Sequence, residues 1–284
     1  MTIKKVIVTG ATGKTGRRVS ALLKAAGHQV YQLSRSGKNE GTQRHFDWNE
    51  QHSYNLGFNE ADWQSVDSAY LLAPAGVVDL LPAMKPFIDR LLERDITPVL
   101  LSSSSLESGG PFMGAVHEYL QKNASLWHVL RPSWFMENFS EQQHLPTIRD
   151  KGKIFSATED GKVGFVSADD IAAVAVRLLT DHNLKSGDYI ITGPEAISYD
   201  TVAQIISESI GKQITHERLT VALLSEQHQN GGLSKEYADG LAALDAAIAA
   251  GDENRVTDCV ERLSGKPPVS FESFAREKQA VWIS

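Results

Sequence analysis

The chain has 284 residues, of which 42% are hydrophobic and 22% are charged, and its formal net charge is -7. This composition is typical of a folded globular protein and excludes a disordered chain or a coiled coil. The acidic balance leaves no basic face, so we expect no nucleic-acid partner. No apolar run is long enough to span a membrane, so we expect no association with a membrane. Cys259 is the only cysteine, which excludes an internal disulfide and a thiolate zinc cluster; we expect a cytoplasmic protein without a metal.

The first half of the chain alternates short strand patterns with longer helical ones. Strands are predicted at Val6–Thr9, Val30–Ser34, Ser68–Leu72, Val99–Leu101 and Trp127–Leu130, and helices at Thr15–Ala26, Val77–Arg94 and Phe112–Lys122. Continuous apolar strands between amphipathic helices indicate a parallel sheet covered on both faces. The expected fold is therefore α/β, a Rossmann doubly wound parallel sheet.

After Asn138 the alternation weakens, and from Ser198 the pattern is mostly helical. The further predicted elements are helices at Asp170–Leu179, Leu241–Ala250 and Arg255–Leu263 and a strand at Asp188–Thr192. No linker rich in Pro, Gly or Ser separates the two parts. We therefore expect a dinucleotide-binding core over residues 1–138 and a smaller, mostly helical C-terminal substrate lobe over 139–284, from which 166–192 return to the core.

A glycine-rich loop, Gly10-Ala11-Thr12-Gly13-Lys14-Thr15-Gly16, follows the first strand and opens the first helix. In such loops the first glycine permits a tight turn, the second lets the backbone approach a pyrophosphate, and the third lets the helix pack on the strand. The helix N-terminus offers N–H groups and a partial positive charge to phosphates. A Walker A loop is excluded, because its first glycine would fall at Val8. We expect a dinucleotide to be bound by Gly10, Thr12, Gly13, Lys14, Thr15 and Gly16, the alternative being an ordinary turn.

The end of the second strand predicts which dinucleotide binds. NAD-specific sites place Asp or Glu about 20 residues after the loop, whereas this strand ends Leu33-Ser34-Arg35-Ser36. A guanidinium pairs with a 2′-phosphate, so Arg35, with Ser34 and Ser36, predicts NADP(H). The alternative is a solvated surface arginine. Asp47, in Phe46-Asp47-Trp48, is predicted to accept a hydrogen bond from the adenine amino group, although a turn-forming role explains it nearly as well.

Two further strand ends are expected to contact the cofactor. Ala73 and Pro74 follow the fourth strand, and Ser102 and Ser103 begin a run of four serines after the fifth. The serine hydroxyls are expected at the nicotinamide ribose or carboxamide, unless they only cap the following turn.

Several segments together resemble one known family. The most specific is Val129-Leu130-Arg131-Pro132-Ser133-Trp134-Phe135-Met136-Glu137-Asn138, and others are Gly109-Gly110-Pro111, Ala157-Thr158-Glu159-Asp160-Gly161-Lys162, Asp170-Ile171-Ala172, Tyr199-Asp200 and Ile214-Thr215-His216. With the glycine loop and Arg35, they resemble the NmrA-like atypical short-chain dehydrogenases, in particular the fungal ergot-alkaloid reductases of the agroclavine dehydrogenase or festuclavine synthase type. The resemblance covers nearly the whole chain. It implies an NADPH-dependent reductase with a Rossmann core, but not that this protein makes alkaloids.

The acid–base pair that is usual in short-chain dehydrogenases is out of register. Those enzymes use Tyr-x-x-x-Lys, in which the lysine lowers the pKa of the proton-donating tyrosine. Here Tyr119 is followed four residues later by Asn123, and Lys122 falls one residue short. His117 is the candidate catalytic group near the nicotinamide, with a helix-surface histidine as the alternative.

Trp134 and Phe135 follow the carboxyl end of a strand, where open α/β sheets bind ligands. With Asn138 they are predicted to bind the substrate, and plain core packing is the alternative. We expect hydride transfer from NADPH to a small, flat, electron-poor molecule, either a cyclic imine or iminium ion or a quinone. The missing Tyr/Lys pair favours a second hypothesis, an NADP(H)-binding redox sensor without catalysis, while the aromatic segment favours the enzyme. The sequence predicts no oligomeric state.

Overall fold

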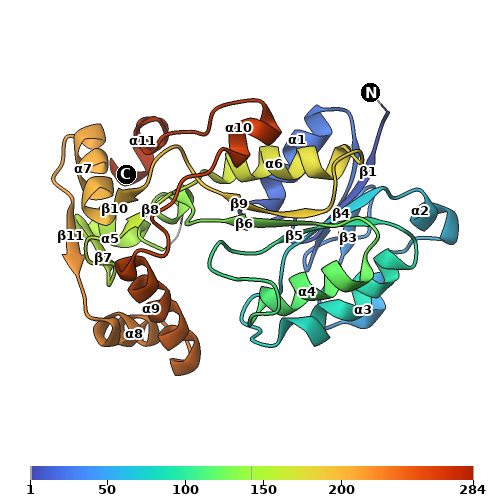
Figure 1. Cartoon of the computed structure of the whole chain (residues 1–284), viewed down its shortest axis with the longest axis horizontal. Coiled ribbons are helices and arrows are strands. Elements are labelled where there is room, and N and C mark those ends of the chain that lie inside the picture. The colour runs from blue at the N-terminus through green and yellow to red at the C-terminus, as the bar shows by residue number, and fades with distance from the viewer. Residues whose placement is uncertain (1, 142, 284) are drawn as a thin grey trace. The chain divides into compact units, whose positions relative to one another are not determined.

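The computed structural model describes residues 2–141 and 143–283, which form two compact units (Figure 1). Unit 1 comprises Met1–Pro132, Ala168–Ile191 and Arg262–Gly265, and unit 2 comprises Ser133–Ser167, Thr192–Glu261 and Lys266–Ser284. The units divide after Pro132, whereas we expected the core to extend to residue 138. The segment after Pro132 joins unit 2 because the Met136 amide donates a hydrogen bond to the Val166 carbonyl.

Unit 1 is built on one seven-stranded sheet of order β3-β2-β1-β4-β5-β6-β9, in which all pairs are parallel. The strands are β1 (Lys5–Val8), β2 (Gln29–Ser34), β3 (Gln43–His45), β4 (Ser68–Leu71), β5 (Thr97–Leu101), β6 (His128–Pro132) and β9 (Gly187–Ile191). This order is that of a Rossmann fold extended by one strand, so the predicted fold is confirmed. Such sheets bind ligands beyond the carboxyl ends of the strands, where the order reverses between β1 and β4.

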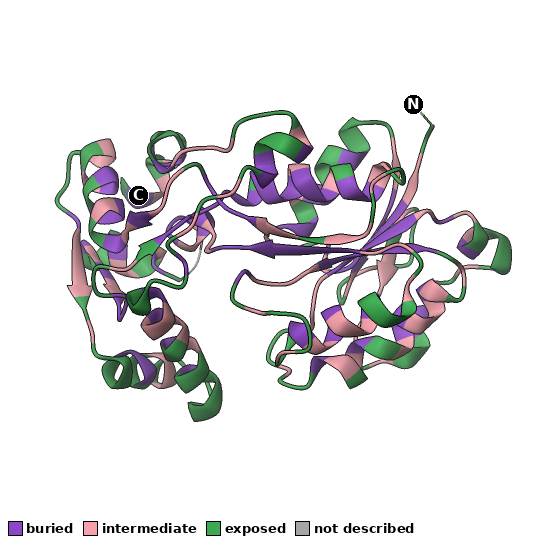
Figure 2. Ribbon diagram, in the orientation of Figure 1, coloured by how far each residue is buried: buried purple, intermediate pink, exposed green. Residues whose placement is uncertain are grey.

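Helices cover both faces of this sheet. Figure 1 shows α1 (Gly16–Ala25) and α6 (Ala168–Thr180) on one face and α3 (Leu80–Leu92) and α4 (Met113–Asn123) on the other; η1 (Gln51–Asn55) and α2 (Glu60–Gln64) complete unit 1. The central strands are buried on both faces (Figure 2), which explains their continuous apolar sequences. Alternate residues of a strand serve opposite faces. Ala69 and Leu71 of β4 join the core cluster that contains Phe87 of α3, whereas the Ser68 hydroxyl donates to the Leu179 carbonyl of α6.

Unit 2 has its own hydrophobic core, formed around Phe139, Phe165, Tyr199 and Phe271. Its elements are η2 (Met136–Asn138), α5 (Leu145–Lys151), β7 (Lys153–Ser156), β8 (Lys162–Val163), β10 (Ile197–Ser198), α7 (Tyr199–Ile210), β11 (Thr215–Arg218), α8 (Val221–Asn230), α9 (Lys235–Ala250), α11 (Phe271–Lys278) and α12 (Ala280–Ile283), while α10 (Cys259–Ser264) falls where the units divide. The indole of Trp282 donates to the Phe139 carbonyl at 2.7 Å, which fastens the end of the chain into this core. None of the helices described here is long and apolar enough to cross a membrane.

The structure corrects two expectations about unit 2. The predicted helix Arg255–Leu263 begins only at Cys259. The preceding residues are not helical, because the Thr257 amide donates to the Thr192 hydroxyl at 2.9 Å instead of to a helical carbonyl. The region after Ser198 also contains a strand, β11, which pairs in parallel with β7. A short strand whose partner lies far away in the sequence leaves little local periodicity to detect.

Candidate active site

The glycine loop is held between the ends of two strands. The Ala11 amide donates to the Leu33 carbonyl of β2 at 3.0 Å, and the Gly13 amide donates to the Gly10 carbonyl at 2.8 Å. Gly10 has a φ of +57°, and a Cβ on it would lie 3.2 Å from the Leu72 side chain that follows β4. The loop therefore needs the conformational freedom of glycine at its first position.

The third glycine sets the distance between helix α1 and this turn. A Cβ on Gly16 would lie 2.2 Å from the Gly10 carbonyl oxygen, so no side chain fits there. A Cβ on Gly13 would meet the same oxygen at 3.1 Å and nothing closer. The protein itself excludes a side chain at Gly16, whereas at Gly13 there is nearly enough room for one. A ligand that approaches the backbone explains why the second position is glycine.

The N-terminus of α1 has unused hydrogen-bond donors. The amides of Thr12, Thr15 and Gly16 donate to no acceptor within residues 2–141 and 143–283. The first turn of α1 contains no acidic residue that would neutralise the helix dipole. Lys14 lies in the same loop, and its carbonyl accepts from the Arg18 guanidinium at 2.8 Å. Three open amides at a helix N-terminus are suited to an anion such as a pyrophosphate.

The residues predicted to choose the dinucleotide surround the end of β2. The Arg35 side chain is exposed, and its guanidinium has no hydrogen bond or ion pair with any described residue. Its carbonyl accepts from the His45 ring at 2.9 Å, which fixes the backbone at this point. The Ser34 and Ser36 hydroxyls lie 3.4 Å apart. A guanidinium that is free on a fixed backbone is available to a phosphate.

Asp47 forms a turn, as the alternative interpretation stated. Its Oδ1 accepts from the backbone and side-chain nitrogens of Asn49 at 2.9 and 3.2 Å. The Asp47 amide donates to the Ser53 hydroxyl, which closes the same turn. The predicted contact between Asp47 and the adenine stays a prediction.

The strand ends near the expected nicotinamide position contain one unpaired hydroxyl. Ala73 and Pro74 are half-buried after β4, next to Leu72, whose amide donates to the Thr9 hydroxyl at 2.8 Å. The Ser102 Oγ is buried without a hydrogen-bond partner in the described chain, whereas the Ser103 hydroxyl bonds to that of Ser105. A buried hydroxyl at a strand end without a partner is suited to a ligand group.

Arg131 of β6 holds the serine loop in place, a role that sequence analysis missed. Its guanidinium donates to the Ser104 carbonyl at 3.0 Å and forms an ion pair with Asp188 of β9 at 2.7 Å. The Ser104 amide donates to the Pro132 carbonyl, which adds a second link. Arg131 stands in the most specific segment of the family resemblance, and that was the only signal for it.

His117 is buried, which excludes the alternative of a helix-surface histidine. Its side chain is 1% exposed on α4, and its ring lies 5.6 Å from that of Trp127. Nε2 contacts the Gln121 amide at 3.2 Å, while Nδ1 has no partner in the described chain. Burial lowers the pKa of His117, the Asp188 carboxylate opposes this, and the Arg131 guanidinium adds to it. The ring is therefore neutral at pH 7. Its catalytic role stays a prediction.

Tyr119 does not have the surroundings of a catalytic tyrosine. Its hydroxyl donates to Asp89 of α3, and the Lys85 ammonium lies 5.0 Å from the centre of its ring. Burial, followed by the hydrogen bond to Asp89, raises the pKa of Tyr119. A proton donor in hydride transfer needs a lowered pKa, so these contacts oppose such a role.

Of the predicted substrate residues, all three lie in unit 2. Trp134 is half-buried against the hydrophobic core of that unit, and its carbonyl accepts from the Val166 amide at 2.9 Å. Phe135 is half-buried and forms a β-bridge with Val166. The Asn138 carbonyl accepts from the His144 amide. These contacts fix the segment, and its part in binding a substrate stays a prediction.

A hydrogen-bonded chain in unit 2 joins segments that the resemblance quoted separately. The His216 ring bonds to the Ser156 Oγ at 2.7 Å and to the Asp200 carboxylate at 3.1 Å, and the Thr158 hydroxyl bonds to Ser156 at 2.7 Å. Burial lowers the pKa of His216, against the effect of Asp200. The neutral ring therefore donates to Asp200 and accepts from Ser156. Asp200 also pairs with Arg218 at 2.6 Å.

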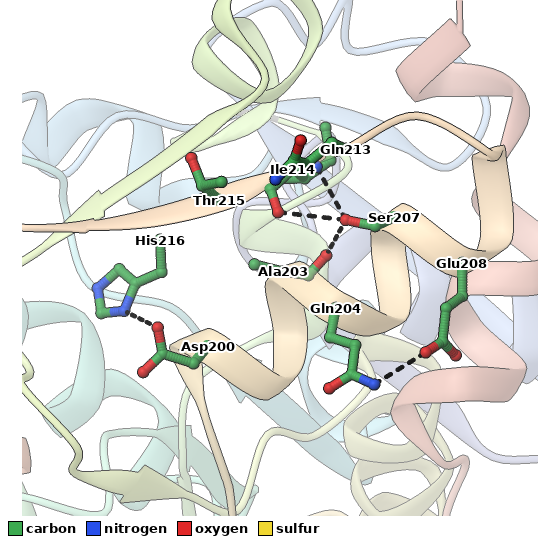
Figure 3. Close-up of a pocket in the computed structure, with 9 residues that line it drawn as sticks. All are labelled: Asp200, Ala203, Gln204, Ser207, Glu208, Gln213, Ile214, Thr215 and His216. Atoms are coloured by element: carbon green, nitrogen blue, oxygen red, sulfur yellow. Dashed lines mark hydrogen bonds and ion pairs between the residues drawn. The ribbon is translucent and has the colours of Figure 1, made fainter.

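This chain of hydrogen bonds has the order of a hydrolytic triad but not its accessibility. Figure 3 shows His216 and Asp200 at one end of the residues that line a pocket between α7 and β11. The pocket has a volume of about 460 Å³. Ser156 is 1% exposed and is not among the residues that line this pocket. A nucleophile must reach its substrate, so we interpret the chain of hydrogen bonds as a link between β7, β11 and α7.

Comparison with known proteins identifies the family. The model of the NmrA-like family matches residues 115–244. Agroclavine dehydrogenase of Claviceps fusiformis is 38% identical over 98% of this chain and 98% of its own length. This chain belongs to the NmrA-like family. The predicted resemblance is therefore confirmed.

Solved structures show the same fold as this NmrA-like protein. Triphenylmethane reductase of a Citrobacter species, complexed with NADP(H), has a TM-score of 0.78 and 21% identity, and covers 96% of this chain and 99% of its own. The NADPH-dependent quinone oxidoreductase QOR2 of Escherichia coli, complexed with NADPH, has a TM-score of 0.74 and 20% identity, with the same coverage. A nucleoside-diphosphate-sugar epimerase shares the fold as well, so these likenesses establish the fold alone.

Gly16→Ala should affect mainly folding stability, whereas Gly13→Ala should affect mainly NADPH binding. Gly16→Ala should destabilise the protein by about 1–3 kcal/mol, because its Cβ would collide with the Gly10 carbonyl. Gly13→Ala should change folding stability by less than about 0.5 kcal/mol and weaken NADPH binding at least about tenfold. Urea unfolding and calorimetric titration measure the two quantities. Unchanged NADPH affinity in Gly13→Ala would mean that the loop does not hold the pyrophosphate.

Arg35→Ala should abolish the preference for NADPH over NADH. The wild type should bind NADPH at least about tenfold more tightly, and the variant should lose most of that difference while NADH affinity stays nearly constant. Arg149→Ala, at a half-exposed arginine of unit 2, is the control and should keep the preference. Equal affinities of the wild type for both dinucleotides would contradict the role of Arg35.

Ser156→Ala should lower the free energy of unfolding by about 1–3 kcal/mol, because it leaves the buried partners of its hydroxyl unsatisfied. Phenylmethylsulfonyl fluoride should not label Ser156 of the wild type, as measured by mass spectrometry of the intact protein and its peptides. Stoichiometric labelling at Ser156 would show an accessible nucleophile and refute the structural interpretation.

Proposed function

We propose that this protein is an NADPH-dependent reductase that transfers hydride to a small, flat, electron-poor acceptor, either a cyclic imine or iminium ion or a quinone. The protein is an NADP(H)-dependent oxidoreductase of the NmrA-like family. One combination of features carries the finer proposal. The Arg35 guanidinium and the amides of the glycine loop have no partner among the described residues, and Tyr119, the residue expected to donate a proton, is bonded to Asp89.

The residues of unit 1 fit an NADP(H) molecule. The open amides of the Gly10–Gly16 loop would hold the pyrophosphate, and Arg35 with the flanking Ser34 and Ser36 would hold the 2′-phosphate. The unpaired hydroxyl of Ser102 would bond to the nicotinamide ribose or carboxamide, with Ser103, Ala73 and Pro74 beside it. When bound, NADPH supplies the hydride. The protein's part is to position and to desolvate, which contributes several kcal/mol in oriented reactions.

The missing proton donor selects the acceptor. Hydride addition to a ketone creates an alkoxide, which needs a proton from a group of matched pKa. Tyr119 is bound to Asp89 with a raised pKa, so it does not provide one. An iminium ion is already positive, and hydride addition neutralises it without a proton. A quinone gives a delocalised anion that water can protonate.

The relatives favour catalysis over sensing. A redox sensor would need only the dinucleotide site. The missing Tyr/Lys pair is therefore compatible with a sensor. The names of the relatives include agroclavine dehydrogenase and festuclavine dehydrogenase, and the solved neighbours include a triphenylmethane reductase and a quinone oxidoreductase. These names support flat conjugated acceptors. His117 stays the predicted catalytic group, and Trp134, Phe135 and Asn138 stay the predicted acceptor contacts.

Turnover with defined acceptors tests the proposal. The wild type should oxidise NADPH with 1,4-naphthoquinone or N-methyl-3,4-dihydroisoquinolinium and hardly at all with cyclohexanone. Tyr119→Phe should keep kcat/KM within about threefold, a change of less than about 1 kcal/mol in the barrier. A large loss in Tyr119→Phe, or efficient oxidation of a secondary alcohol with NADP, would restore the conventional mechanism. Tight NADPH binding with no turnover of any acceptor would instead support a sensor.

A further inference from the structure

Phe112 adopts a backbone conformation that side-chain-bearing residues rarely tolerate. It directly precedes α4 and has φ +53° and ψ -121°. This region is sparsely populated by residues other than glycine, and holding one there costs about 1–3 kcal/mol. Such strain persists only where the surrounding structure enforces it, and it is found most often at functional sites.

The surrounding loop enforces this conformation. The Gly109 amide donates to the Gly114 carbonyl at 2.9 Å, and the Gly114 amide donates to the Pro111 carbonyl at 3.0 Å. A Cβ on Gly114 would lie 2.4 Å from the Glu107 carbonyl, so the loop closes tightly over the first turn of α4. The Ser108 hydroxyl also bonds to the Gln121 side chain of α4 at 2.5 Å. The backbone of Phe112 is therefore clamped on both sides.

The phenyl ring is not one of the buried core residues, so burial in the core does not offset this strain. Phe112 is 39% exposed, lies outside the core cluster of unit 1, and forms no aromatic contact with any described residue. Leu56 makes an informative comparison, since it also has a positive φ, of 55°. Its side chain is only 2% exposed within that core, so burial offsets its unusual backbone. The Phe112 ring is much less buried, so burial offsets less of its strain.

Because α4 connects the parallel strands β5 and β6, its first turn, which Phe112 precedes, lies toward the carboxyl ends of the strands, where such sheets bind ligands. The loop leaves the sheet at the carboxyl end of β5, beside β4, at the edge where the glycine loop follows β1 (Figure 1). It begins with Ser102, whose hydroxyl is unpaired, and it leads into the helix that contains His117. The loop after the neighbouring strand β4 exposes a second large apolar side chain, Val78, which is 48% exposed.

We propose that Phe112 is a substrate-specificity residue, whose ring stacks on the flat face of the acceptor at the nicotinamide end of the site. This inference rests on the proposed function and narrows it to acceptors with an extended conjugated face. An aromatic ring has a negative face, which attracts a cationic iminium and stacks offset on an electron-poor quinone. An acceptor with two fused rings covers more of the phenyl face than one with a single ring and depends on it more strongly.

Two substitutions separate the ring from the strain. Phe112→Gly removes both the ring and the strain, whereas Phe112→Ala removes the ring alone. Both should raise KM for 1,4-naphthoquinone at least about tenfold, with NADPH affinity unchanged and a smaller effect on 1,4-benzoquinone. Phe112→Gly should melt about 2 °C or more above Phe112→Ala, because only glycine relaxes at this backbone position. Phe112→Tyr should keep the wild-type KM, and Leu22→Ala, at a side chain of matched 40% exposure on α1, should change neither KM.

Calorimetric titration of 1,4-naphthoquinone into the NADP-saturated protein provides a measurement that is independent of turnover. The wild type should bind it at least about tenfold more tightly than Phe112→Gly does. If the wild type oxidises NADPH but KM and quinone affinity are the same in Phe112→Gly, the role of Phe112 is refuted and the proposed function stands. If neither turnover nor quinone binding occurs in the wild type, both are refuted. A lower melting temperature in Phe112→Gly than in Phe112→Ala would show that the backbone at this position is not strained, which would overturn the premise of the proposal.

Discussion

The contact between the first turn of α1 and the Gly10 carbonyl is the constraint on which the rest of the site depends. The missing Cβ of Gly16 lets the helix begin directly against the end of β1. Because the helix begins there, the amides of Thr12, Thr15 and Gly16 find no acceptor among the described residues, at the point where the strand order reverses. Glycine at position 16 therefore leaves several N–H groups exposed at one place, which makes the local potential positive. An anionic dinucleotide would neutralise this potential.

The ionisable side chains of unit 1 limit which acceptors a bound NADPH could reduce. Arg35 offers a positive charge, but neither of the two candidate acid–base groups is in the state of a conventional proton donor. His117 is neutral and buried against Trp127, and Tyr119 is bonded to Asp89 on the opposite helix. Under the proposed function, such a site suits acceptors whose reduction needs no proton from the protein. Positioning would then be the main contribution of the protein, and the proposed stacking of the Phe112 ring on the acceptor would serve it.

Unit 2 contains a serine, a histidine and an aspartate that resemble a catalytic triad but have a structural role. The Ser156, His216 and Asp200 side chains repeat the hydrogen-bond order of a hydrolytic relay, yet burial of the serine removes the access that nucleophilic catalysis requires. The same three residues satisfy one another and join two strands and a helix, for which low accessibility is an advantage. Accessibility, more than the identity of the residues, distinguishes a catalytic triad from a structural link of this kind.

The sequence by itself determined the features that depend on local order. The β1–loop–α1 unit, the arginine that replaces an acid at the end of β2, the parallel sheet and the family could all be inferred, because turn glycines, apolar strands and motif spacing are properties of neighbouring residues. The alternatives left open at Asp47 and His117 could not be resolved that way. A turn-forming carboxylate and a surface histidine differ from their functional counterparts only in what surrounds them.

Only the tertiary structure decided what depends on distant partners. The pairing of β7 with β11, the bond of Thr257 to Thr192 that delays the start of a predicted helix, and the hydrogen bond of Arg131 to the serine loop join residues far apart in the sequence. The conformation of Phe112 belongs to the same class, because no local preference predicts a phenylalanine at positive φ. It arises from the closure of a loop onto α4. Local propensities are too weak to register such constraints, and packing imposes them only once the chain has folded.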